Sequence, residues 1–134
     1  MSSHVPEGFQ TIVPYLFVDD PEGFVAFLVE AFDASSVKMH YEPEDVLRHG
    51  EVSVLGSVLE LSQARPECPA TAVHLHAFVP DADAAYARAL AAGATSIYAP
   101  TDHDYGERSG GVRDRWGNRW YLATVTDAEK RAGG

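Results

Sequence analysis

A stretch near the middle of the chain, residues 71–93, changes from alternating to helical periodicity across one short turn. Its first part, AVHLHAFV, has apolar side chains at every second position, which is the period of a β-strand. Pro80 with an acidic residue, Asp81 or Asp83, then predicts the start of a helix, and Gly93 stands where a left-handed C-terminal cap is expected. The helix should cover the apolar face of its strand. The opposite face then carries His74, His76 and Phe78.

The same order of elements occurs earlier in the chain, at residues 14–32. Pro21 follows a capping Asp20, and phenylalanine and leucine side chains recur at helical spacing up to Phe32. Such repetition indicates a duplicated unit. Coincidence is the alternative interpretation, because strand–helix units are common.

Each strand–helix unit is followed by residues that alternate like three further strands. In the first copy, a strand ended by Pro43 precedes a hairpin that turns near Gly56. In the second copy, a short strand ended by Pro100 precedes a polar loop at residues 101–110, which could cover a cleft, and a hairpin that turns at DRWGN. The sequence therefore predicts an α+β fold of two βαβββ modules with mainly antiparallel strands.

The expected boundaries place the whole chain, residues 1–134, in a single domain. Module one should cover about 10–63, a linker 64–70, module two about 71–125, and a polar tail 126–134. The first strand of module one is expected at about residues 10–18, and the charged residues 44–48 are expected as a loop.

The composition of the chain limits its partners. Its 46% hydrophobic and 22% charged residues suit a globular domain, and the single cysteine, Cys68, can form no intrachain disulfide. A net charge of −10 repels phosphate backbones and anionic lipids, so neither nucleic acid nor a membrane is an expected partner. No apolar stretch is long enough to span a bilayer and the N-terminus lacks a signal core, which predicts a cytoplasmic protein.

The C-terminal third, YGERSGGVRDRWGNRWYLAT, together with LFVDD and the duplicated element order, resembles the glyoxalase, bleomycin-resistance and extradiol dioxygenase superfamily, also called vicinal oxygen chelate. The PhnB-like branch of that superfamily is the most similar. Glu107 stands where the branch usually has aspartate, and Arg115 where it has proline. The resemblance implies paired βαβββ modules that curl around a cavity, commonly in a homodimer. Trp116 and Trp120, costly to leave exposed, also favour a homodimer.

Metal-dependent members of this family hold a divalent ion with His, Glu, His and Glu on the first and last strands of each module. The matching positions here are Val13, Glu60, His74 and Tyr121, so two of the four ligands are absent. A catalytic site generally needs three protein ligands. No cofactor is therefore expected, and the alternative is a divalent metal ion in a rearranged site. That site would consist of His49, Glu60, His74 and His76.

Alternation places several polar and aromatic side chains on the sheet faces opposite the helices, where the resemblance puts the cavity. Any one of them could serve only a neighbour's hydrogen bond, but burying several titratable groups in one cleft is costly unless a ligand or a proton-transfer step uses them. The predicted ligand-binding residues are Tyr15, Phe17, His49, Glu51, Glu60, His74, His76, Phe78, Arg119 and Tyr121.

Three functions are compatible with these residues. The leading hypothesis is a metal-free protein of the bleomycin-resistance kind that sequesters a small-molecule ligand, with aromatic rings for stacking and acidic groups for a cationic or polar guest. The alternative is a metal-dependent lyase, isomerase or dioxygenase. A third hypothesis is metal-free acid–base catalysis, for which the catalytic candidates are His74 and His76.

Overall fold

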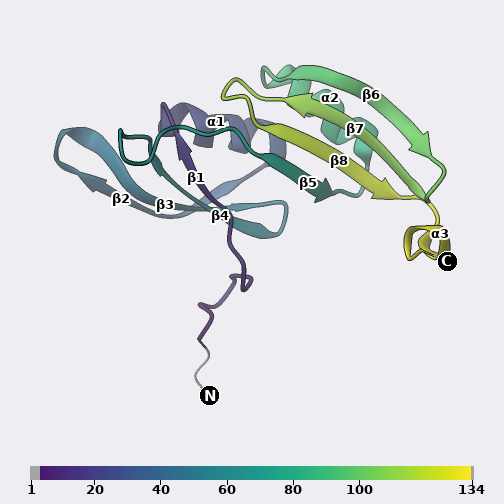
Figure 1. The fold of residues 1–134 in the computed structure, drawn as a ribbon, viewed down its shortest axis with the longest axis horizontal. Coiled ribbons are helices and arrows are strands. Elements are labelled where there is room, and N and C mark those ends of the chain that lie inside the picture. The colour runs from purple at the N-terminus through teal and green to yellow at the C-terminus, as the bar shows by residue number, and fades with distance from the viewer. Residues whose placement is uncertain (1–3, 134) are drawn as a thin grey trace. The chain divides into compact units, whose positions relative to one another are not determined.

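The structure is a computed structural model in which residues 4–133 are described, and the chain forms two compact units (Figure 1). Unit 1 comprises the chain up to Val29 together with Asp33–Thr71. Unit 2 comprises Glu30–Phe32 together with the chain from Ala72 onward. No helix in the described part of the chain has the length and apolar character needed to cross a membrane.

The first module has the predicted order of strand, helix and three strands. Its sheet has the order β1-β4-β3-β2, in which β1 and β4 are parallel and the other neighbours antiparallel. A short 3₁₀ turn, Pro43–Asp45, separates β2 from β3. The elements are β1 (Tyr15–Val18), α1 (Pro21–Phe32), β2 (Ser35–Glu42), β3 (Val46–Val54) and β4 (Ser57–Gln63).

The second module repeats that order and ends in a short additional helix. Its sheet has the order β5-β8-β7-β6, again with one parallel pair, β5 and β8. The elements are β5 (His74–Phe78), α2 (Ala82–Ala91), β6 (Thr95–His103), β7 (Glu107–Arg113), β8 (Arg119–Val125) and α3 (Ala128–Arg131). The predicted α+β fold of two βαβββ modules is thus confirmed.

Both long helices begin at the predicted caps. The Asp20 carboxylate accepts a hydrogen bond from the Gly23 amide at 3.1 Å, and the Asp81 carboxylate accepts one from the Ala84 amide at 3.1 Å. Beyond the end of α2, Gly93 adopts a φ of 110°, which a residue with a side chain rarely adopts. Local sequence chemistry therefore sets where the helices start and stop.

One face of each sheet is buried in an apolar core. In unit 1, apolar residues of β3 and β4 are buried together with Phe24, Phe27 and Leu28 of α1. In unit 2, α2 packs on β6, β7 and β8, and Val112, Trp120 and Leu122 are buried. The buried apolar strand residues of unit 1 are Leu16, Val18, Leu47, Val52, Val54, Val58, Leu59 and Leu61.

Several predicted boundaries are wrong. The first strand starts only at Tyr15, because Pro14 has no amide hydrogen to donate, and the Gln10 side chain instead bonds the backbone of Val58 at 2.8 and 3.2 Å. Residues 46–48, expected in a loop, belong to β3, because the loop is shortened to the 3₁₀ turn.

The polar loop expected at residues 101–110 is also wrong, because β6 continues through Pro100 to His103 and β7 begins at Glu107. An edge strand such as β6 tolerates proline, since one of its sides needs no amide donor. Trp120, expected to be costly to leave exposed, is buried within unit 2, so it no longer supports a dimer. The expected polar tail contains α3.

Candidate functional site

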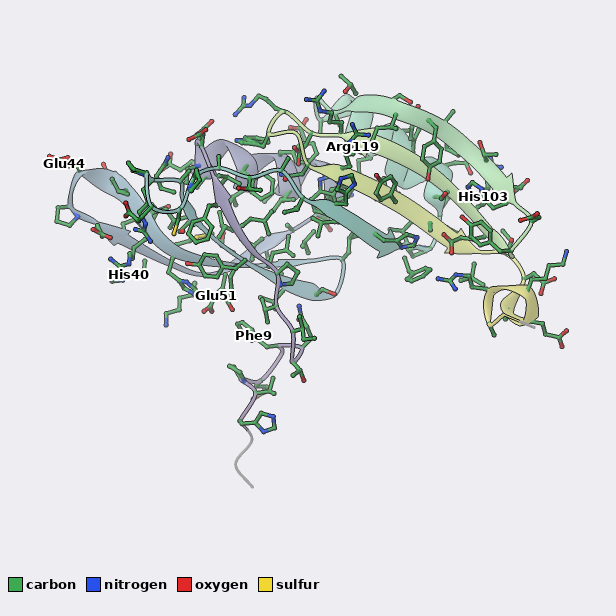
Figure 2. The ribbon with its side chains drawn as sticks, viewed as in Figure 1. Phe9, His40, Glu44, Glu51, His103 and Arg119 are labelled. Carbon is green, nitrogen blue, oxygen red and sulfur yellow. The ribbon has the colours of Figure 1, made fainter. Side chains whose placement is uncertain are left out.

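A row of polar side chains crosses the sheet face of unit 1 that lies opposite the buried core. His49 and Glu51 stand two residues apart on β3 and therefore share this face. Glu51 is labelled in Figure 2. His49 Nδ1 lies 3.2 Å from the Tyr15 hydroxyl, and His49 Nε2 lies 2.9 Å from Glu51 Oε2. Glu60 Oε1 lies 3.7 Å from the same nitrogen. The imidazole thus bridges a phenol and two carboxylates.

The two carboxylates of this row repel each other. Glu51 and Glu60 are directly opposite in the antiparallel pair β3–β4, where like charges are destabilising. Their side chains are only 17% and 24% exposed, and within residues 4–133 no Lys or Arg lies at ion-pair distance from either. His49, when protonated, can compensate at most one of the two charges.

Aromatic rings and a buried hydroxyl adjoin this row. The rings of Tyr15 and Phe17 on β1 lie 5.0 Å apart, and Tyr15 is exposed. Ser62, opposite Phe17 in the sheet, is fully buried, and its Oγ has no hydrogen-bond partner among the described residues. A buried hydroxyl normally has a partner, so this atom is an exception among the described residues.

The matching face of unit 2 carries a second group of predicted residues. His74 Nδ1 lies 2.8 Å from the Tyr121 hydroxyl, and the two rings are stacked with their centroids 5.9 Å apart. Arg119, opposite His74 in the parallel pair β5–β8, is exposed and forms no ion pair with any described residue (Figure 2). This end of the face therefore offers an imidazole, a phenol and a free guanidinium.

A buried carboxylate anchors the other end of the same face. Glu107 on β7 is 2% exposed, and its Oε1 lies 3.0 Å from His76 Nε2. Its Oε2 accepts a hydrogen bond from Arg131 Nε of α3 at 2.6 Å. Burial on its own raises the pKa of the Glu107 carboxyl, but the hydrogen bonds from Arg131 and His76 outweigh burial and hold that pKa below its ordinary value. Glu107 is therefore ionised at neutral pH.

A third cluster lies near the hairpin between β6 and β7. Ser109 Oγ lies 2.9 Å from both the Tyr98 hydroxyl and His103 Nε2, and the His103 ring stacks on Tyr105. His103 is labelled in Figure 2. Burial, followed by the nearby Glu107 charge, raises the pKa of the Tyr105 phenol. Ser109 is buried, so its hydroxyl serves to hold the two neighbouring side chains.

The predicted residues fall into two groups of neighbours, one in each unit, and their role in binding stays a prediction. Sequence reasoning missed Glu107, Ser109, His103 and Arg131, because residues 101–110 were expected as a loop and Arg131 as part of a tail. The alternation E-R-S-G-G in β7 was the available signal for Glu107 and Ser109. No such signal exists for Arg131, whose reach to Glu107 depends on how α3 docks.

The rearranged metal site is not assembled within either unit. Among the described residues, no group of three or more His, Cys, Asp or Glu side chains is arranged to hold a metal ion. Of the alternative ligands, His49 and Glu60 belong to unit 1, and His74 and His76 to unit 2. Each of these histidines already has a side-chain partner. His74 contacts a hydroxyl, His76 a carboxylate, and His49 has one of each, so both of its ring nitrogens are engaged.

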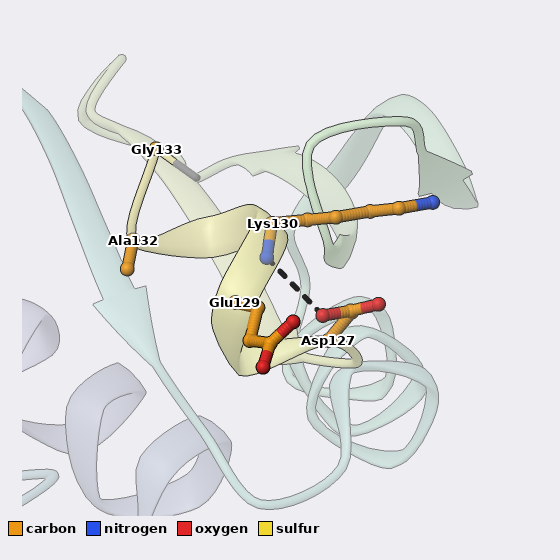
Figure 3. A pocket seen from close by; sticks show the side chains of 5 residues that line it. All are labelled: Asp127, Glu129, Lys130, Ala132 and Gly133. Carbon is orange, nitrogen blue, oxygen red and sulfur yellow. Dashed lines mark hydrogen bonds between the residues drawn. The ribbon is translucent and has the colours of Figure 1, made fainter.

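A surface pocket of about 540 Å³ lies beside α3 (Figure 3). Its lining comes from the short helix and its flanks, where the Lys130 amide donates to the Asp127 carboxylate at 3.1 Å. None of the predicted site residues lines it. The lining residues are Asp127, Glu129, Lys130, Ala132 and Gly133.

Comparison with known proteins places this chain in a known group. The sequence profile of the Glyoxalase/Bleomycin resistance protein/Dioxygenase superfamily matches residues 8–122. The chain belongs to this superfamily. An uncharacterised protein of Mycobacterium bovis is 34% identical over 120 residues, which cover 81% of this chain and 79% of that protein.

Two solved structures share the fold of this chain. TioX from Micromonospora sp. ML1 aligns with a TM-score of 0.71 and 22% identity, over 88% of this chain and 98% of TioX. A PhnB protein from Bacillus cereus, described as a putative 3-demethylubiquinone-9 3-methyltransferase, aligns with a TM-score of 0.64 and 16% identity, over 87% of this chain and all (100%) of that one. The family match confirms the predicted superfamily, and a PhnB protein is among the structures that share the fold.

Proposed function

We propose that the protein binds small organic molecules on the polar face of each unit, without a tightly held metal ion, and sequesters them. The observation that carries this proposal is the pair of opposed, half-buried carboxylates, Glu51 and Glu60. Holding two like charges together in a sheet costs stability, so a cation that binds between them would relieve the cost. Members of this superfamily usually bind small molecules, which is consistent with such a site.

The expected guest in unit 1 is an organic cation with a flat apolar part. An ammonium or guanidinium group would lie against Glu51 and Glu60, and its ring would lie against Tyr15 and Phe17. The net charge of −10 favours the approach of a cation. Metal-free binding agrees with the two absent ligand positions, Val13 and Tyr121, since neither side chain replaces a His or Glu ligand.

Benzylammonium and benzyl alcohol make a matched pair of probes, because they differ in charge but little in shape. We expect benzylammonium, titrated into ¹⁵N-labelled protein, to shift the amide signals of β1, β3 and β4, and benzyl alcohol to shift them at most weakly. Glu60→Gln should weaken the benzylammonium effect severalfold, whereas Glu22→Gln, on an exposed turn of α1, should leave it unchanged. Equal shifts from both probes would contradict the proposal.

We further propose that the protein pairs with a second copy of itself. Proteins of this superfamily commonly form homodimers. In addition, Trp116 is only half-buried, and its ring centre lies 4.3 Å from the Arg115 guanidinium carbon. Light scattering at tens of micromolar should give twice the mass of one chain. A mass of one chain, 14.5 kDa, would refute the dimer.

A further inference from the structure

The hydrogen bonds around Glu107 fix the orientation of His76. A carboxylate can only accept hydrogen bonds, so the contact of 3.0 Å means that His76 Nε2 carries the hydrogen and donates it. In the neutral imidazole the lone pair is then on Nδ1. Among residues 4–133, no group hydrogen-bonds that nitrogen, and the His76 side chain is 42% exposed. An oriented base therefore faces solvent, with its carboxylate buried behind it.

Phe78 adds a flat apolar surface next to His76, and Arg131 holds Glu107 in place. The Phe78 ring lies 4.8 Å from the His76 ring and is 56% exposed, although an isolated phenylalanine prefers to be buried. The Arg131 guanidinium lies 5.4 Å from the centre of the Phe78 ring and also donates a hydrogen bond to Glu107 Oε2. Arg131 is itself held, because α3 docks on Gly106, where a Cβ would collide with the backbone of Asp127.

We propose that His76 is the general base of a metal-free proton-transfer site, positioned by Glu107, for a planar small molecule that lies on Phe78. In the step, a C–H, O–H or N–H bond of the substrate breaks, its electron pair stays on the substrate, and a new N–H bond forms at His76 Nδ1. The Glu107 carboxylate stabilises the resulting imidazolium, and water later takes the proton. The inference rests on the proposed small-molecule binding and adds a reaction to it.

The base can be tested with a model substrate, so the natural ligand need not be known. In 5-nitrobenzisoxazole, a planar compound, removal of the C3 proton converts the C–H pair into the third bond of a nitrile, the N–O bond breaks, and its pair forms a coloured nitrophenolate. We expect the chelator-treated full chain to accelerate this elimination with saturation. His76→Gln should lower kcat/KM by about 100-fold or more, the usual share of a general base.

The variants separate chemistry from structure. Glu107→Gln should lower kcat by about tenfold or more with KM unchanged, because it removes the charge that stabilises the imidazolium and leaves the Phe78 surface intact. His40→Gln, an exposed histidine of β2, should leave the rate unchanged. The same compound titrated into ¹⁵N-labelled protein reports binding at β5 separately.

Equal rates for the unmodified chain and His76→Gln would overturn the inference. Amide shifts at β5 in that case would show that the compound binds without reaction, and the binding proposal would stand. If Glu107→Gln raised KM and left kcat unchanged, the inference would also be overturned, because Glu107 would then act only in binding.

Discussion

At the scale of single residues, Glu107 is the clearest case of a charge that the fold depends on. It is buried, yet each of its oxygens has a cationic or polar partner, Arg131 on one side and His76 on the other. Those partners are half-exposed, so part of the ion pair is screened by water. The carboxylate is therefore tolerated because its hydrogen bonds replace the water that it loses.

The depressed pKa of Glu107 predicts a pH-dependent contribution to stability. Because the folded-state pKa lies below the ordinary value of 4.5, the contribution is fully present above pH 4.5 and is lost as pH falls through the folded pKa. Glu107→Gln should lower the free energy of unfolding by about 1–3 kcal/mol at pH 7 and by less at pH 3. Urea unfolding at the two pH values measures this difference. Glu30→Gln, an exposed carboxylate on α1, is the control, and a pH-independent loss would contradict the assignment.

Sequence alone supplied the polar residues of the unit 1 face but only part of those of unit 2. Alternation assigned His49, Glu51 and Glu60 to one face and His74 with His76 to another, because a period of two is a local property of a strand. Glu107 was missed because Pro100 was taken as the end of a strand. Only the position of β6 at the sheet edge makes that proline acceptable.

At the scale of elements, the turn between β7 and β8 depends on one buried side chain. The Asp114 carboxylate accepts four hydrogen bonds, from the amides of Trp116 (3.0 Å) and Asn118 (2.9 Å), from Asn118 Nδ2 (3.1 Å) and from Trp120 Nε1 (3.0 Å). Asn118 in turn accepts from the Val73 amide at 3.0 Å, which ties the turn to the start of β5. The sequence DRWGN predicted the turn but not this network, which exists only after Trp120 is buried.

Asp114→Asn tests the network with little change of shape. An amide nitrogen in place of Oδ2 would face the donors of Asn118 and Trp120, so we expect a loss of about 2–4 kcal/mol in the free energy of unfolding. Circular dichroism during urea unfolding measures the loss. Asp104→Asn, in the exposed turn before β7, should change stability by less than about 0.5 kcal/mol. Similar values for the two variants would mean that Asp114 does not hold the turn.

The apolar stripe of α1 can be tested with two residues of the same helix. Phe27 is buried, so Phe27→Ala should cost about 3–5 kcal/mol, the usual range for a large-to-small change in a core. Val29 is 43% exposed, and Val29→Ala should cost less than about 1 kcal/mol. Thermal unfolding compares the two variants. If the Phe27 variant unfolded at the wild-type temperature, Phe27 would not pack in the core and the apolar stripe of α1 would be wrongly assigned.

At the scale of the whole molecule, the two modules share an order of elements and differ in chemistry. The face in unit 1 combines two carboxylates with one imidazole, whereas the face in unit 2 combines two imidazoles with one buried carboxylate. Duplication of one unit would explain the shared order of elements, because a repeat preserves the strand–helix–three-strand order. Side-chain identity is not constrained by that order, so each face must be tested separately.

The metal-free proposal makes a prediction for the intact protein. Dialysis against a chelator should leave benzylammonium binding at β1, β3 and β4 unchanged, and metal analysis of protein purified without chelator should find far less than one divalent ion per chain. The reason is the donor set: two of the four family positions, Val13 and Tyr121, lack a metal ligand of the family type, and no described group of three ligands replaces them. Binding or activity that vanishes on chelation and returns with added zinc, nickel, manganese or iron would refute this. Tyr121 or a neighbouring histidine would then complete a site, and the metal-dependent lyase, isomerase or dioxygenase would replace the binding protein as the function.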